Sequence, residues 1–243
     1  MFAHVTIRAS DREASERFYR TVLTVLGIEP THDTSELVAW DDFALLAADR
    51  AHPPTRHLHA GFVARTRAAV EAFWDAGTAA GFHDAGAPGE RTQYRDDYYG
   101  AFLRDPDGNS IEAVHHGDTR AGGNVDHLWI GVRDLGAAQA FYATTSRWLG
   151  LRPGHRWNTG VQFAGAWATF SVIADGRAPT EGLHLAFPAP DRRTVVAFHA
   201  GATAAGYRDH GAPGERQHYG EGYFAAYVLD PDGTNVESVI RGA

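Results

Sequence analysis

The chain has 243 residues, of which 44% are hydrophobic and 21% are charged, so its composition is that of a globular protein. A formal net charge of -8 argues against non-specific binding of nucleic acid, which needs a basic surface to neutralise phosphates. Cysteine and lysine are both absent, which excludes disulfides, thiolate ligands and lysine Schiff-base chemistry and leaves nitrogen and oxygen atoms as metal donors.

Hydrophobic periodicity predicts a strand, a helix and two further strands in the first 50 residues. Residues 5–8 alternate as a half-buried strand. Ser10-x-x-Glu13 predicts a capping box at the start of a helix that ends near Gly27. Two short apolar runs follow, at residues 36–40 and 43–48.

A strand, a helix and three further strands are predicted in the next part of the chain. The patterns predict a strand at residues 59–63, an amphipathic helix from Thr66 to about Gly81, and strands near 92–94, 98–104 and 110–115. The Gly-Ala-Pro-Gly-Glu-Arg segment (86–91) is predicted to be a loop over the mouth of a cleft, and Asp-Pro-Asp-Gly (105–108) a hairpin turn.

The chain then repeats itself. Residues 81–91 return as 206–216, and residues 105–112 return as 230–237. The repeat predicts four βαβββ modules, the third from residue 127 to about 176 and the fourth from 183 to 240. A glycine-rich linker at 116–126 separates two predicted domains, 1–118 and 124–243.

No part of the sequence predicts a membrane span or an export signal. No stretch approaches the roughly 20 apolar residues that a span requires. The N-terminus lacks a charged segment followed by an apolar run. We therefore expect a cytoplasmic protein that binds a small molecule rather than nucleic acid or a membrane.

One motif carries a family resemblance. A paired βαβββ module whose aromatic strand runs through Tyr98-Tyr99-x-x-Phe102 into Asp105-Pro106-Asp107-Gly108-x-x-x-Glu112 resembles the vicinal oxygen chelate superfamily, which includes glyoxalases, bleomycin-resistance proteins and extradiol dioxygenases. The resemblance covers nearly the whole chain. It implies an α+β fold in which four βαβββ modules form two domains with curved mixed sheets around clefts.

The resemblance also implies two metal sites with ligands on the first strand of each module and on the last strand. The ligands are His4, His59 and Glu112 in the first half and His127, His184 and Glu237 in the second. His57 competes with His59, but the repeat pairs His59 with His184. Two imidazoles and one carboxylate leave open positions on Fe, Mn, Zn or Ni.

Strand alternation agrees with this placement, because it puts His4 on the face opposite the apolar Val5 and Ile7. The pairing of modules stays open. Modules can pair within each half, or exchange so that His4 joins the ligands of the fourth module, His184 and Glu237. Because the fused chain supplies internally what single-half relatives obtain by dimerising, we expect a monomer, with a homodimer as the alternative.

Further residues are candidates for catalysis and substrate binding. His218 and Tyr227 resemble the acid–base pair upstream of the ligating glutamate in extradiol dioxygenases, but the surrounding residues depart from that pattern. Candidates for the cleft wall and for substrate binding are Tyr98, Trp129, Tyr223 and, as a bidentate anion-binding fork, Arg216. His116 is predicted to lie on the surface.

We therefore expect a divalent-metal-dependent enzyme whose metal chelates vicinal oxygens of a small substrate. Its chemistry would be that of a lyase, an isomerase or a dioxygenase. The alternative is a metal-free resistance protein that sequesters a drug or metabolite in an aromatic-lined cleft.

Overall fold

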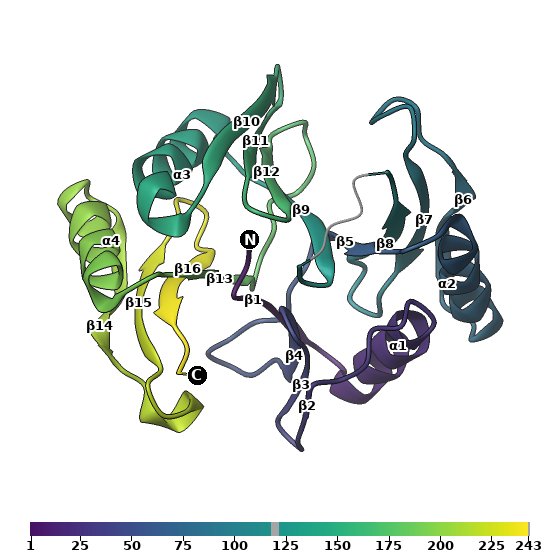
Figure 1. Ribbon diagram of the computed structural model, residues 1–243, viewed down its shortest axis with the longest axis horizontal. Helices are drawn as coiled ribbons and strands as arrows, with labels where there is room; N and C mark the ends of the chain where they lie inside the picture. Colours follow the sequence, from purple (N-terminus) through teal and green to yellow (C-terminus); the bar gives the residue numbers. More distant parts are fainter. Residues whose placement is uncertain (118–121, 243) are drawn as a thin grey trace.

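The computed structural model describes residues 1–117 and 122–242. Within these residues the chain forms an α+β fold of two eight-stranded mixed sheets and four α-helices (Figure 1). The domain limits 1–118 and 124–243 stay predictions, since residues 118 and 243 lie outside the described part.

The chain forms a strand, a helix and three strands in that order four times, which confirms the four βαβββ modules. The first half contains β1 (His4–Ala9), α1 (Arg12–Thr24), β2 (His32–Asp33), β3 (Leu37–Trp40), β4 (Phe43–Ala47), β5 (Leu58–Val63), α2 (Arg67–Ala79), β6 (His83–Glu90), β7 (Tyr99–Arg104) and β8 (Ser110–His115). The second half contains β9 (Val125–Gly131), α3 (Leu135–Leu149), β10 (Arg152–Trp157), β11 (Gly160–Ala164), β12 (Thr169–Ile173), β13 (His184–Pro188), α4 (Arg192–Ala204), β14 (Arg208–Glu215), the 3₁₀ helix η1 (Gln217–Tyr219), β15 (Phe224–Leu229) and β16 (Asn235–Ile240).

Each sheet joins one module from each half of the chain. The strand orders are β14-β15-β16-β13-β1-β4-β3-β2 and β10-β11-β12-β9-β5-β8-β7-β6. At the two junctions, β1 runs antiparallel to β13 and β5 runs antiparallel to β9. The modules are therefore exchanged between the halves: the first pairs with the fourth, and the second with the third.

The helices pair differently from the strands. α1 contacts α2, and α3 contacts α4, with the two pairs on opposite sides of the molecule (Figure 1). The buried face of α1 carries Phe18, Tyr19 and Val22 in the hydrophobic core. Burial of each such large side chain contributes on the order of 1.5–3 kcal/mol. None of the helices in the described part is both long and apolar enough to cross a membrane.

The start of α1 differs from the predicted capping box. Asp11, not Ser10, is the N-cap, and its carboxylate accepts the backbone N–H of Ala14 at 3.0 Å. Ser10 instead donates its hydroxyl to Asp107 at 2.6 Å. A carboxylate is favoured at this position because it combines a hydrogen bond with attraction to the positive end of the helix dipole.

The sixth strand also differs from the prediction. No strand forms at residues 92–94; β6 occupies 83–90 and includes most of the segment that was expected to be a loop. Its pairing with β7 shifts register twice, between Asp84 and Gly86 and between Gly86 and Gly89. Pro88 is tolerated there because β6 is an edge strand, where a missing N–H leaves no inter-strand bond unmade. β14 has the same form in the second half.

Candidate metal centres

Two clusters of histidine and glutamate lie where the exchanged modules meet. The His4 site consists of His4, His184 and Glu237, and the His59 site consists of His59, His127 and Glu112. In each cluster one histidine comes from one half of the chain, and the other histidine and the glutamate come from the other half. The structure thus brings together all six residues predicted as ligands, in the exchanged arrangement.

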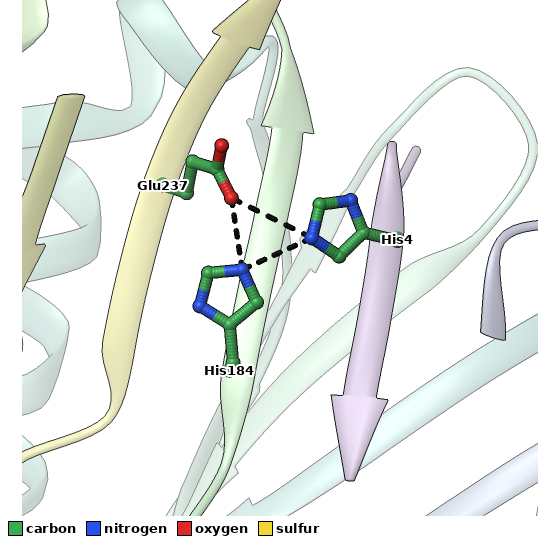
Figure 2. A group of neighbouring side chains, drawn as sticks. All are labelled: His4, His184 and Glu237. Carbon is green, nitrogen blue, oxygen red and sulfur yellow. Dashed lines mark hydrogen bonds and ion pairs between the residues drawn. The ribbon is translucent and has the colours of Figure 1, made fainter. Parts of the chain in front are cut away.

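The ligand atoms have the spacing of three groups around one ion. In the His4 site the two Nε2 atoms lie 3.0 Å apart, and Glu237 Oε2 lies 2.8 Å from His184 and 3.5 Å from His4 (Figure 2). In the His59 site the corresponding distances are 3.0, 3.1 and 3.3 Å. Two ligands roughly 2.1 Å from one ion and at about 90° to each other lie about 3.0 Å apart. The residues present therefore fit a divalent metal.

The strands explain how the side chains reach these positions. Along β1, Val5 and Ile7 are buried on one face, and His4 faces a cavity on the other, as alternation predicts. In the His59 site two glycines leave room for the ligands. A Cβ on Gly61 would lie 2.2 Å from the His127 ring, and one on Gly100 would lie 2.5 Å from the Glu112 carboxylate.

Hydrogen bonds orient the ligands of the His59 site. His127 Nδ1 bonds Asp126 at 2.9 Å, and His59 Nδ1 bonds the Ser110 hydroxyl at 3.0 Å. Burial by itself lowers the pKa of His127, but the hydrogen bonds to Asp126 and Glu112 outweigh it and raise the pKa to about 9. Burial raises the pKa of Glu112, yet its bonds to the two histidines lower it to about 2. The glutamate is therefore an anion, as a metal ligand must be.

The His4 site has different neighbours. Burial, then the nearby His184 and Arg241, hold the pKa of His4 well below its usual value. Arg241 Nη2 lies 2.7 Å from His4 Nδ1. Tyr223 donates its hydroxyl to Glu237 Oε1 at 2.7 Å. Burial, reinforced by Glu237, raises the pKa of Tyr223, so this phenol stays protonated and donates.

A cavity opens above each site. The cavity at the His59 site measures about 560 Å³, and the one at the His4 site about 720 Å³. Tyr98 and Trp129, two residues predicted to bind substrate, line the first cavity, and Tyr223 lines the second. Tyr98 also donates to Glu112 Oε1 at 2.7 Å, as Tyr223 does in the other site. The Trp129 ring centroid lies 5.5 Å from that of His59.

The predicted dioxygenase pair is not brought together. Tyr227 lines the His4 cavity, 6.2 Å from the His184 ring between centroids. His218 lies in η1 with an exposed side chain whose ring contacts Tyr219, and it is not among the residues that line the cavity.

Arg216 does not face the cavity either. Its guanidinium donates to the backbone carbonyls of Ala212 and Glu215 and lies over the Tyr227 ring. Because these contacts use it to hold the bulged strand β14, its role in the fold is to brace that strand beside the site.

Sequence reasoning missed three residues at the sites. Arg241 was not considered, Asp126 was predicted to end the linker but is buried in β9, and the prediction that His116 lies on the surface is wrong. His116 is buried and bonds Asp126 at 3.1 Å. An acidic residue directly before a candidate ligand was a signal for Asp126; no local signal marked Arg241, which reaches His4 only through the sheet pairing.

Two solved structures of similar fold match nearly the whole chain. Glyoxalase I from Zea mays has a TM-score of 0.65 and 16% identity over 98% of this chain and 91% of its own. A protein described as a putative dioxygenase from Bacillus subtilis has a TM-score of 0.67 and 13% identity over 98% of this chain and 84% of its own. A glyoxalase/bleomycin resistance protein from Albidiferax ferrireducens is 30% identical over 48% of this chain and 98% of its own, with a TM-score of 0.43. No curated protein matches the chain by sequence.

Two mixed sheets of βαβββ modules, each with a cluster of ligand-type residues at its centre, define a tandem member of a fold class built on this module. The profile of the Glyoxalase/Bleomycin resistance protein/Dioxygenase superfamily matches residues 1–113 and 124–238. The chain belongs to this superfamily.

Proposed function

We propose that this protein is a divalent-metal-dependent enzyme that acts on a small molecule through two vicinal oxygen atoms. The observation that carries the proposal is the pair of clusters, each with two imidazole nitrogens and one carboxylate oxygen within 3.5 Å of one another at the base of a cavity. Three protein ligands leave open positions for two substrate oxygens on Fe, Mn, Zn or Ni.

A bound metal would supply Lewis acidity, which stabilises negative charge on a substrate oxygen. The protein's own residues prepare the site for that task. The Tyr98 hydroxyl donates a hydrogen bond to Glu112 Oε1, so the other carboxylate oxygen, Oε2, faces the histidines. The glutamate is 1% exposed, so little water competes for it. Trp129 and Tyr94 meet edge to face and form an aromatic wall that positions a flat substrate over the open side.

The contacts favour lyase or isomerase chemistry over ring cleavage. Dioxygenase action of the expected type would need His218 beside the substrate, and this side chain is outside the cavity wall. Acid–base work is left to groups that do line the cavities, such as Tyr227, whose ring centroid lies 6.2 Å from that of His184. Since the exchange within one chain completes both sites, a monomer suffices for activity.

The test is the metal content of untagged protein purified without chelators, measured by elemental mass spectrometry. The double variant His59→Ala/His184→Ala should lose the metal that the unaltered protein retains. The matched control is His57→Asn/His210→Ala, which alters one histidine in each cavity wall outside the clusters and should keep the metal. Asparagine is chosen because His57 has φ 59°, which asparagine tolerates. Protein that neither carries metal nor takes it up on reconstitution would refute the proposal and favour metal-free sequestration.

A further inference from the structure

Equivalent histidines in the two sites face opposite chemical partners. His127 and His4 occupy matching places at the start of β9 and β1, and each offers Nε2 to its cluster. What differs is the group on the other nitrogen, Nδ1. That group decides which nitrogen carries the proton of a neutral imidazole, and hence which one has a lone pair for a metal.

In the His59 site the partner is a carboxylate. Asp126 Oδ1 lies 2.9 Å from His127 Nδ1, and Asp126 is itself buried and bonded through Oδ2 to His116 at 3.1 Å. A carboxylate can only accept, so Nδ1 carries the proton of the neutral ring, and the lone pair of that ring is on Nε2, which faces the cluster. This carboxylate–histidine arrangement fixes the tautomer and raises ligand basicity in metal sites.

In the His4 site the partner is a cation. The repeat replaces Asp126 by Ala3 and His116 by Arg241, and Arg241 Nη2 lies 2.7 Å from His4 Nδ1. A guanidinium can only donate, so His4 Nδ1 accepts, and the proton of the neutral ring is on Nε2. His4 therefore presents an N–H, not a lone pair, to His184 and Glu237.

A second difference lies in the neighbouring strand. Gly61 faces His127 across the β5–β9 pair, where the imidazole fills the space that a Cβ would take. The equivalent residue facing His4 is Ala186, which is fully buried. The site with the Asp126 carboxylate is thus also the site with the glycine. Both differences between the sites act on the equivalent histidines, His127 and His4.

We propose that the two sites are unequal metal centres, with the His59 site binding divalent metal tightly and the His4 site weakly because Arg241 holds His4 in the tautomer that cannot ligate. This inference rests on the proposed function, because it says which of the two proposed metal centres binds the metal more tightly. Substrate activation then belongs to the His59 cavity, and the His4 cavity differs from it by a guanidinium in direct contact with a histidine of its cluster.

The experiment uses single-site proteins titrated with Mn²⁺ alone and followed by electron paramagnetic resonance. His184→Ala leaves the His59 site, and His59→Ala leaves the His4 site. Compared near pH 9, where a proton on His127 no longer competes with the metal, the dissociation constant of the His4 site should be at least about tenfold larger. Loss of an outer partner of a metal ligand typically costs about 10–100-fold in affinity. Equal constants in the two single-site proteins would overturn the inference.

Exchanging the partners tests the cause. Ala3→Asp/Arg241→His, added to the His59→Ala protein, gives His4 the partners that His127 has and should tighten Mn²⁺ binding by about tenfold or more. The reciprocal change, Asp126→Ala/His116→Arg in the His184→Ala protein, should weaken it by a similar factor. A single change, Arg241→Met, should give part of the tightening without adding a carboxylate.

The controls distinguish failure of this inference from failure of the proposed function. Circular dichroism and the melting temperature of each metal-free variant show whether it is folded. If Ala3→Asp/Arg241→His is not folded, Arg241→Met tests the cause in its place. Absence of Mn²⁺ binding in both single-site proteins would refute this inference, whereas the proposed function is decided separately by the metal content of the unaltered protein. Binding in both with equal affinity, or no response to Arg241→Met, would refute only the inequality.

Discussion

Gly61→Ala is the sharpest perturbation of the His59 site, because it adds one methyl group and removes no ligand. The new Cβ would lie 2.2 Å from Cε1, 2.6 Å from Nδ1 and 2.8 Å from Nε2 of His127, whereas ordinary contact begins at 3.4 Å. The imidazole must therefore retreat by about 1 Å, which is well beyond the roughly 0.2 Å tolerance of a metal–ligand distance.

Two effects of Gly61→Ala can be separated by size. Displacement of His127 from its place between Asp126 and the cluster should weaken Mn²⁺ binding by about 10–100-fold. Overpacking the strand costs about 1–3 kcal/mol of unfolding free energy, partly offset by about 0.4–1 kcal/mol because alanine restricts the unfolded chain. The net loss of stability should therefore be about 1.3 kcal/mol, and no more than about 2.6 kcal/mol.

The assay is Mn²⁺ titration of Gly61→Ala in the His184→Ala background, together with chemical unfolding of the metal-free protein. Ala186→Gly, the reverse change at the equivalent position facing His4, is the control and should not weaken binding. The reasoning is wrong if Gly61→Ala binds Mn²⁺ with unchanged affinity, or if a crystal structure of the variant shows the His127 ring in its original place.

Three further results are expected. Tyr98→Phe removes the bond to Glu112 and should weaken Mn²⁺ binding by up to about tenfold, a loss of up to about 1.4 kcal/mol; unchanged titrations would contradict this. Because the pKa of His127 is raised to about 9, its protonation stabilises the metal-free protein fully below pH 6.5, and this stabilisation is lost as the pH rises through 9. A metal must displace that proton, so Mn²⁺ affinity should increase with pH up to about 9. A Mn²⁺ affinity that does not change with pH would refute this prediction. Tyr19→Phe removes the buried 2.8 Å bond to Asp105 and should lower the unfolding free energy by about 1–3 kcal/mol in urea denaturation; no change would show that the bond contributes nothing.

Much of the fold followed from local pattern. Alternation at β1 predicted that Val5 and Ile7 are buried and that His4 faces the cavity, because successive side chains of a strand point to opposite faces. The repeat predicted the order of the four modules. The segment that forms β6 was misread because its glycines and Pro88 are typical of loops, and an edge strand with bulges accommodates them.

The motifs in the sequence, through the resemblance they carry, named the six ligand-type residues. The two-residue period of a strand predicted the face on which His4 lies. The tertiary structure decided which of them meet. A strand's hydrophobic pattern selects its buried face but not the strand that pairs with its edge, so β1 could join either β5 or β13 until the modules packed. Asp126 adjoins His127 in the sequence, whereas only the packing brings Arg241 onto His4, and this contact between distant residues sets how the two sites differ.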